Sequence, residues 1–197
     1  METTRLEAFS DGVFAIAITL LILEIKVPPL ADLGHGLLQL WPSYLAYSIS
    51  FVVIGAIWLN HHAMFEWIDR VDHQLMLLNT LQLMFIAFLP FPTAVLAEAL
   101  HARLEQTVAT AFYGGTLTII GVLVTVMWHY AASRRELLNE SISPARAKVI
   151  GRQFLIGPTG YALATVLAFV SPWISIALFI GLNVFFLWPR NRRADPT

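Results

Sequence analysis

Polar side chains interrupt three long apolar segments of this sequence. Asp11 follows Ser10 near the start of the first segment, and Asn79 lies near the start of the third. Asn60 and His61 lie together toward the end of the second segment. A carboxylate and an imidazole can exchange a proton, whereas hydroxyl and amide groups form hydrogen bonds between helices. These residue types therefore indicate either a proton relay or a hydrogen-bond network, depending on how the segments are arranged.

The composition places these segments in a membrane. Of the 197 residues, 57% are hydrophobic and 13% are charged, and the mean hydropathy is +0.69. A soluble domain has about 25% charged residues, so a soluble enzyme and a nucleic-acid-binding protein are excluded, as is a disordered chain. The sequence contains no cysteine, which excludes disulfides and thiolate metal sites. Motifs of hydrolases, metalloproteases and phosphate loops are also absent, so we predict neither enzymatic activity nor a cofactor.

Six apolar segments are long enough to cross a bilayer as helices. A crossing helix needs about 20 mostly apolar residues, because each residue advances ~1.5 Å through a ~30 Å hydrocarbon core. The predicted fold is an all-α integral membrane protein, in which residues 1–197 form one six-helix unit. Pro90 and Pro92 predict a bend in the third helix. The predicted helices cover residues 8–26, 41–66, 74–97, 107–131, 152–171 and 173–189.

The basic residues predict the orientation of these helices. With a cytoplasmic N-terminus, ten of the twelve Lys and Arg residues fall on the cytoplasmic side, and only Lys26 and Arg103 fall outside. Basic residues favour the cytoplasmic side, so we predict that both termini are cytoplasmic and that the protein lies in the cell membrane. Trp58 lies inside the second helix. The other tryptophans are predicted at helix ends, where indole rings favour the interface: Trp41, Trp67, Trp128, Trp173 and Trp188.

In this orientation, the polar residues of the first three helices lie at a similar depth. An ionisable side chain inside a span costs several kcal/mol and normally faces the bundle interior or a water-filled path. We therefore expect Asp11 to pair with a His or Asn of the second helix. Three interpretations are open: hydrogen bonds that hold the helices together, a proton relay through Asp11 and His61, and a role beside a gate. His61 and His62 point ~100° apart on a helix, so no metal site is predicted.

An apolar stripe runs along the first helix. Ile16, Leu20 and Leu23 follow one another at i, i+4 and i+7, and Thr19 lies beside them. Such a stripe faces lipid, the core of the bundle or a pore, and the spacing alone leaves these three interpretations open.

Residues 5–19 closely resemble the first-helix signature Arg-x-x-x-Phe-Ser-Asp of the transmembrane protein 175 family, in particular the bacterial relatives of the endolysosomal potassium channel. The similarity extends to residues 58–62 in the second helix and to residues 79–93 in the third. The later helices match only in number and topology. The signature residues in this chain are Arg5, Phe9, Ser10 and Asp11.

The resemblance implies a potassium-permeable channel without a carbonyl selectivity filter. It implies a homotetramer in which one six-helix unit per chain contributes its first helix to a central pore. Ile16, Leu20 and Leu23 are then implied to form narrow apolar rings, with Thr19 as a polar position near the constriction. Potassium ions would be the permeant species. The residues implied or expected to brace the first helix against the next two are Arg5, Phe9, Ser10, Asp11, Trp58, Asn60, His61 and Asn79.

A secondary cation or proton-coupled transporter is the alternative function. It would use Asp11 and His61 as the coupling pair. The sequence shows no detectable inverted repeat of the kind that many such transporters contain, so the channel is the preferred prediction.

Overall fold

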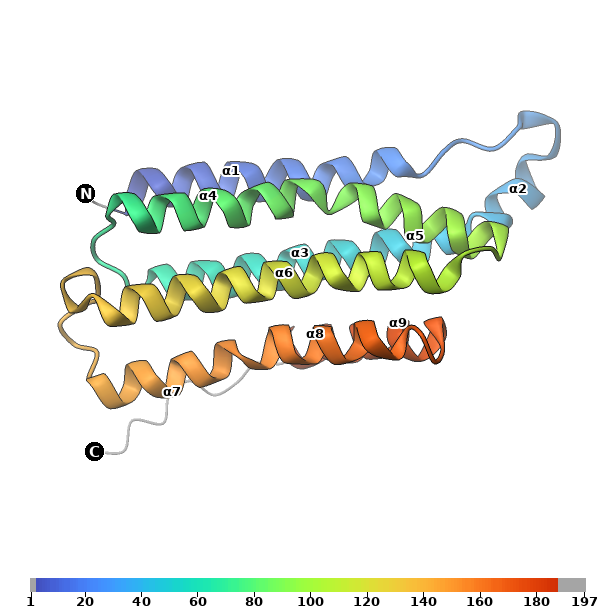
Figure 1. The fold of residues 1–197 in the computed structure, drawn as a ribbon. Coiled ribbons are helices and arrows are strands. Elements are labelled where there is room, and N and C mark those ends of the chain that lie inside the picture. The colour runs from blue at the N-terminus through green and yellow to red at the C-terminus, as the bar shows by residue number, and fades with distance from the viewer. Residues whose placement is uncertain (1–2, 188–197) are drawn as a thin grey trace.

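The structure is a computed structural model that describes residues 3–187. It is a bundle of helices that run side by side (Figure 1). Short 3₁₀ helices cover Leu21–Glu24 (η1), Leu30–Asp32 (η2) and Arg135–Leu137 (η3). The α-helices are α1 (Thr4–Leu20), α2 (Leu33–Gln39), α3 (Trp41–Phe65), α4 (His73–Phe88), α5 (Pro90–Ala102), α6 (Gln106–Ser133), α7 (Pro144–Phe154), α8 (Ile156–Leu167) and α9 (Pro172–Leu187).

The first four predicted crossings are confirmed as long apolar helices. Four spans have the length and composition needed to cross a membrane, and they cover Thr4–Glu24, Trp41–Phe65, His73–Ala102 and Gln106–Ser133. The third consists of α4 and α5, which meet at Leu89, as the two prolines predict. Pro90 has no N–H to donate to the Ile86 carbonyl one turn earlier, and the Leu89 N–H donates to that carbonyl instead, at 3.1 Å.

The prediction of a helix over 152–171 is wrong in its boundaries, because the chain breaks at Leu155 into α7 and α8. Pro158 lacks the N–H that would bond to the Phe154 carbonyl one turn earlier. The Thr125 hydroxyl of α6 donates to that carbonyl at 2.9 Å instead. The last helix, α9, begins at Pro172, one residue before its predicted start, and the predicted positions 188 and 189 lie outside the described residues.

Two residues show how tightly α6 packs against the C-terminal helices. A Cβ atom on Gly114 would lie 2.6 Å from the Phe179 ring of α9 and would also collide with the Thr165 hydroxyl of α8. Trp128, which was predicted at the membrane interface, is buried instead, and its indole N–H donates to the Ala147 carbonyl at 3.1 Å. The indole of Trp128 therefore joins α6 to α7. Trp188, another tryptophan predicted at the interface, lies outside the described residues.

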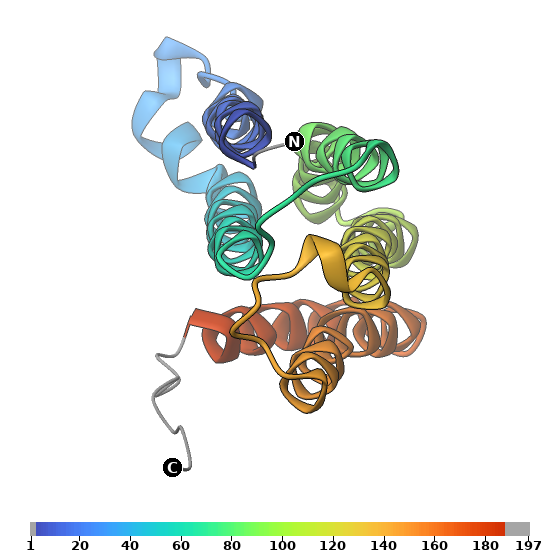
Figure 2. The same cartoon turned by 90° about the vertical axis from the view of Figure 1, so that its left-hand side faces the viewer.

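Helix α1 lies at the edge of the bundle, against α3 and α4 and away from α8 and α9 (Figure 2). It is the least buried of the four spans. Of an apolar stretch of 18 residues in each span, 22% is buried in the first, against 39%, 50% and 56% in the other three. The start of α1, the loops at 66–72 and 134–143 and the basic helix α7 gather at one end of the bundle (Figure 1). The chain therefore leaves a long face of α1 uncovered.

Candidate functional site

Helix α1 has a buried face and an exposed face. Ser10, Phe14, Ala17 and Leu21 recur at helical spacing and are all buried against α3 and α4. The opposite face contains Ile16, which is 61% exposed. Because the exposed face is broad and mostly apolar, it requires lipid, another protein surface or a dewetted pore as its surroundings.

The predicted apolar stripe lies entirely on this exposed face. Leu20 and Leu23 are 40% and 61% exposed, and Thr19 is exposed beside them. The Thr19 hydroxyl donates to the carbonyls of Ala15 and Ile16, both at 2.9 Å. Leu23 lies in η1 rather than in α1, because the α-helix ends at Leu20. The stripe thus continues from an α-helix into a 3₁₀ turn.

On the buried face, three side chains form one hydrogen-bonded chain across three helices. The Asn79 amide of α4 donates to the Ser10 hydroxyl of α1 at 3.0 Å. The carbonyl oxygen of Asn79 lies 2.8 Å from Nε2 of His61 on α3, which therefore donates. All three side chains are buried, and the edge of Phe14 packs on the His61 ring at 5.4 Å between centroids. We call Ser10, Asn79 and His61 the brace.

The expected partner of Asp11 was wrong. Asp11 accepts a hydrogen bond from the indole N–H of Trp58 at 2.8 Å, and no His or Asn is its partner among the described residues. His61 is turned inward to Asn79, whereas Asp11 is exposed in the single chain. Within the described part of the chain, Asp11 and His61 form no hydrogen bond or ion pair with each other, so the coupling pair of the alternative transporter is not directly bonded.

The remaining predicted network residues do not join the brace. The Asn60 amide donates to the Ala56 carbonyl of its own helix at 2.8 Å. Phe9 is 56% exposed, and Arg5 is exposed with no side-chain hydrogen bond or ion pair to another described residue. The structure therefore brings together Ser10, His61 and Asn79, pairs Asp11 with Trp58, and leaves Arg5, Phe9 and Asn60 apart.

A second buried polar network was not predicted. The Ser50 hydroxyl of α3 lies 2.8 Å from the Thr93 hydroxyl of α5 and 2.9 Å from the Tyr113 hydroxyl of α6. Isolated hydroxyl groups are common in membrane helices, where they can bond to their own backbone, so the sequence contains no distinctive signal for this network.

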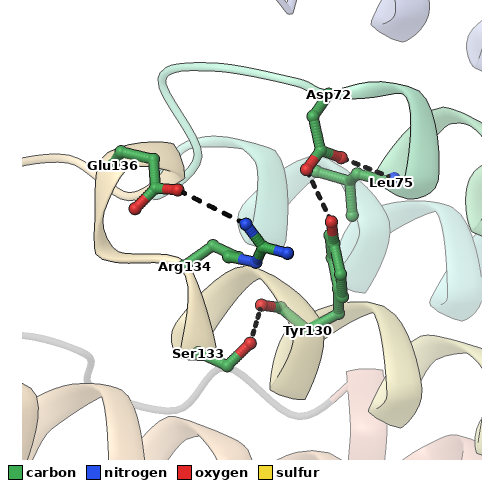
Figure 3. Close-up of polar contacts among 6 residues, drawn as sticks. All are labelled: Asp72, Leu75, Tyr130, Ser133, Arg134 and Glu136. Atoms are coloured by element: carbon green, nitrogen blue, oxygen red, sulfur yellow. Dashed lines mark hydrogen bonds and ion pairs between the residues drawn. The ribbon is translucent and has the colours of Figure 1, made fainter.

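Helix α4, which supplies Asn79 to the brace, is fixed at its start by Asp72. The Asp72 carboxylate accepts from the Leu75 amide at 2.8 Å as an N-cap and from the Tyr130 hydroxyl of α6 at 2.6 Å (Figure 3). Nearby, the Arg134 guanidinium lies 3.8 Å from Glu136. Partial desolvation raises the pKa of Asp72, but the two hydrogen bonds and the Arg134 charge outweigh it and lower this pKa below its usual value.

We expect Asp72→Ala to destabilise the protein by about 1 kcal/mol at neutral pH, since this is a typical value for a lost N-cap. A lowered pKa stabilises the folded state above the unfolded-state pKa, near 4, and this stabilisation is lost as pH falls through the folded-state pKa. The difference from the unsubstituted protein should therefore shrink below about pH 4. Thermal unfolding of the purified protein at several pH values measures this difference.

The matched control is Asp32→Ala. Asp32 is at the N-cap position of α2, but its side chain forms no capping hydrogen bond. We expect this substitution to change stability by less than about 0.5 kcal/mol at every pH. Equal effects of the two substitutions would show that the Asp72 carboxylate does not stabilise the start of α4.

Several known proteins are similar to this chain in sequence and in fold. The family described as the endosomal/lysosomal potassium channel TMEM175 matches residues 5–90. A potassium channel of Chamaesiphon minutus is 43% identical over 96% of both chains. A potassium channel of Streptomyces collinus is 44% identical over 92% of this chain and 93% of its own. The crystal structure of a lysosomal potassium-selective channel TMEM175 homolog from Chamaesiphon minutus aligns with a TM-score of 0.84 and 42% identity, over 93% of this chain and 95% of that one.

Proposed function

Because the chain belongs to the TMEM175 family of ion channels, we propose that it forms a potassium-permeable pore that is lined by α1. The family consists of channels and not of enzymes. Four copies of the chain surround the pore, and their exposed α1 faces meet on its axis. The observation behind this proposal is the exposed face of α1, which contains both an apolar stripe and a carboxylate.

The carboxylate argues against lipid as the surroundings of this face. Asp11 is exposed in the single chain, and Trp58 supplies one hydrogen bond to it. A carboxylate inside a span normally faces protein or a water-filled path, because exposure to lipid costs several kcal/mol. A face with Asp11 and Thr19 is therefore better suited to neighbouring copies and an aqueous axis than to acyl chains.

The apolar stripe supplies the constriction in this proposal. Rings of Ile16, Leu20 and Leu23 close a pore when the neck between the side chains is too narrow and apolar to hold water. In this proposal the pore has no carbonyl filter. Thr159-Gly160-Tyr161 is similar to part of the Thr-Val-Gly-Tyr-Gly filter of common potassium channels, but it lies inside α8, where backbone carbonyls accept helical hydrogen bonds. Permeation is controlled by side chains in this arrangement.

We place each chain across the cell membrane six times, with both termini in the cytoplasm. In addition to the four long spans, residues 152–171, which comprise the end of α7 and all of α8, form the fifth crossing, and α9 forms the sixth. The described basic residues support this orientation, since Arg70, Arg134, Arg135 and those of α7 lie at the end where α1 begins. Arg190, Arg192 and Arg193, which were also predicted to be cytoplasmic, lie outside the described residues.

Reversal potentials in planar bilayers test the proposed function. A potassium channel is expected to give a current that reverses near the potassium equilibrium potential, and an added pH gradient should leave this reversal potential unchanged. Asp11→Asn keeps an oxygen that accepts from Trp58 and removes only the charge. We therefore expect this variant to assemble normally and to give the same reversal potential.

A proton-coupled transporter would behave differently in both measurements. Its reversal potential would follow the pH gradient with a fixed stoichiometry, and Asp11→Asn would abolish that dependence. Either result, obtained with protein that assembles normally, would show that the protein is a proton-coupled transporter and not a channel.

A further inference from the structure

A cavity separate from α1 lies between α3, α6, α7 and α8. Its volume is about 980 Å³, which is at the upper end of the ~300–1,000 Å³ range of small-molecule sites. Ile57 of α3, Val124 of α6 and Phe186 of α9 are among its apolar lining residues. None of these side chains belongs to the brace or to the stripe, so the proposed permeation path does not account for the cavity.

The length of the cavity corresponds to one leaflet of a bilayer. Its lining begins at Ala56 of α3 and extends to Trp67, two residues past the end of that helix. At ~1.5 Å per residue, the helical part of this stretch, residues 56–65, rises about 14 Å. Half of a ~30 Å hydrocarbon core is ~15 Å. Trp67 lies at the end of the bundle that contains α7, and tryptophan favours the level of the lipid headgroups. The cavity therefore extends from the headgroup level to the middle of the membrane.

Polar and charged groups are concentrated at the α7 end of the cavity. Ser143, which caps α7 through the Arg146 amide, lines this end together with Arg146 and Gln153. Among the described lining residues, Arg146 is the charged one and none is acidic. Helix α7 also contains Lys148 and Arg152 but no Asp or Glu. The open end of the cavity is therefore positively charged, and its deeper wall is largely apolar.

We infer that the cavity binds an anionic phospholipid of the cytoplasmic leaflet. The acyl chains lie along the apolar wall between α3 and α6, and the phosphate lies at the mouth beside Arg146. The charges favour this ligand, because a basic pocket between membrane helices attracts the anionic lipids of the cytoplasmic leaflet. The Asn60 amide and the Tyr161 hydroxyl, which line the cavity, already donate to the Ala56 carbonyl and to Asn183, so these groups do not require a polar ligand.

Lipid titration of the purified full-length protein tests whether the site prefers an anionic headgroup. Bound lipid is counted by native mass spectrometry with dioleoyl phosphatidylglycerol and with dioleoyl phosphatidylcholine, which share acyl chains. We expect the anionic lipid to bind about tenfold more tightly than the zwitterionic one. We expect Arg146→Gln to reduce this preference about fivefold, because one basic residue near an anionic lipid surface strengthens binding by about that factor. Lys148→Gln is the matched control, since Lys148 is exposed on the same helix and does not line the cavity. It should change the preference less than about twofold.

Substitutions that fill the cavity test whether the acyl chains of the lipid lie inside it. A Cβ on Gly157 would meet only the Phe186 ring, at an ordinary 3.7 Å, so a larger side chain there extends into the cavity without a backbone collision. We expect Gly157→Leu to weaken the binding of both lipids about tenfold, and Gly157→Ala to have a smaller effect in the same direction. Gly181→Leu is the control, because a Cβ at Gly181 meets nothing within 4 Å and Gly181 does not line the cavity.

Two results would overturn the inference. If Arg146→Gln and Lys148→Gln reduce the preference equally, the basic surface attracts lipid without a site. If both Gly157 variants unfold at the temperature of the unsubstituted protein but bind both lipids as it does, the cavity is not where lipid binds. These measurements do not depend on ion conduction, so they fail separately from the proposed function.

Discussion

Asn79→Ala is expected to destabilise the protein by about 2–4 kcal/mol and to lower its thermal unfolding midpoint by roughly 5–15 °C. The substitution removes the acceptor of the His61 ring and the donor to the Ser10 hydroxyl. Both partners are buried, so no water replaces the lost bonds, and an unpaired buried polar group costs about 1–3 kcal/mol. Thermal unfolding of the purified protein, followed by tryptophan fluorescence, measures the midpoint.

Asn60→Ala is the matched control for this substitution. Among the described residues, the Asn60 amide donates to the Ala56 carbonyl of its own helix and to no other group, so we expect a loss below about 1 kcal/mol. Replacing both members of the buried pair by apolar groups, Asn79→Leu with His61→Phe, should recover much of the stability lost in Asn79→Ala. If Asn79→Ala and Asn60→Ala had equal effects, the brace would not hold α1 on the bundle.

Ile16→Asn is expected to raise potassium conductance about tenfold and to reduce discrimination between potassium and sodium. In the proposed pore, the Ile16 ring excludes water, and an amide in its place lets the neck stay wet. Each ~1.4 kcal/mol removed from the barrier to permeation increases the rate about tenfold. Single-channel recordings in planar bilayers, with potassium and sodium on opposite sides, measure both quantities.

Ile119→Asn provides the same chemical change on another exposed helix face. Ile119 lies on α6 and is 42% exposed, and the proposed assembly places it away from the pore. We expect its substitution to reduce membrane insertion or yield while the conductance of assembled channels stays the same. Ile16→Asn channels that assemble normally and conduct with unchanged selectivity would remove Ile16 from the pore, and with it the proposed constriction.

The sequence predicted the polar layer but not all of its pairs. Helix direction and depth place Ser10, His61 and Asn79 at one level, and the brace confirms that prediction. The partner of Asp11 could not be obtained in this way, because depth does not specify which side of a helix a residue faces. Trp58 lies inside a span, away from the interface that indole rings favour, and its indole N–H is the donor that binds the Asp11 carboxylate.

The break between α7 and α8 could have been predicted from the same physics as the bend at Leu89. Pro158 removes one helical donor, as Pro90 does. The difference lies in what satisfies the freed carbonyl. The Ile86 carbonyl freed by Pro90 accepts from the neighbouring Leu89 N–H, whereas the Phe154 carbonyl freed by Pro158 accepts from Thr125 of α6, 29 residues earlier. A contact between distant parts of the chain has no local signature.

The change from α1 to η1 sets the angular register of the two outer leucines. In a continuous α-helix, residues three apart are separated by ~300° around the axis, so Leu23 would be offset from Leu20 by ~60°. A 3₁₀ turn has three residues per turn and a rise of ~2.0 Å, so residues i and i+3 lie directly above one another, ~6 Å apart. Rewinding these few residues into an α-helix would swing Leu23 away from the line of Leu20 while the brace, three turns away, stays in place. The direction in which Leu23 points is therefore set by the backbone hydrogen-bonding pattern at the end of the helix.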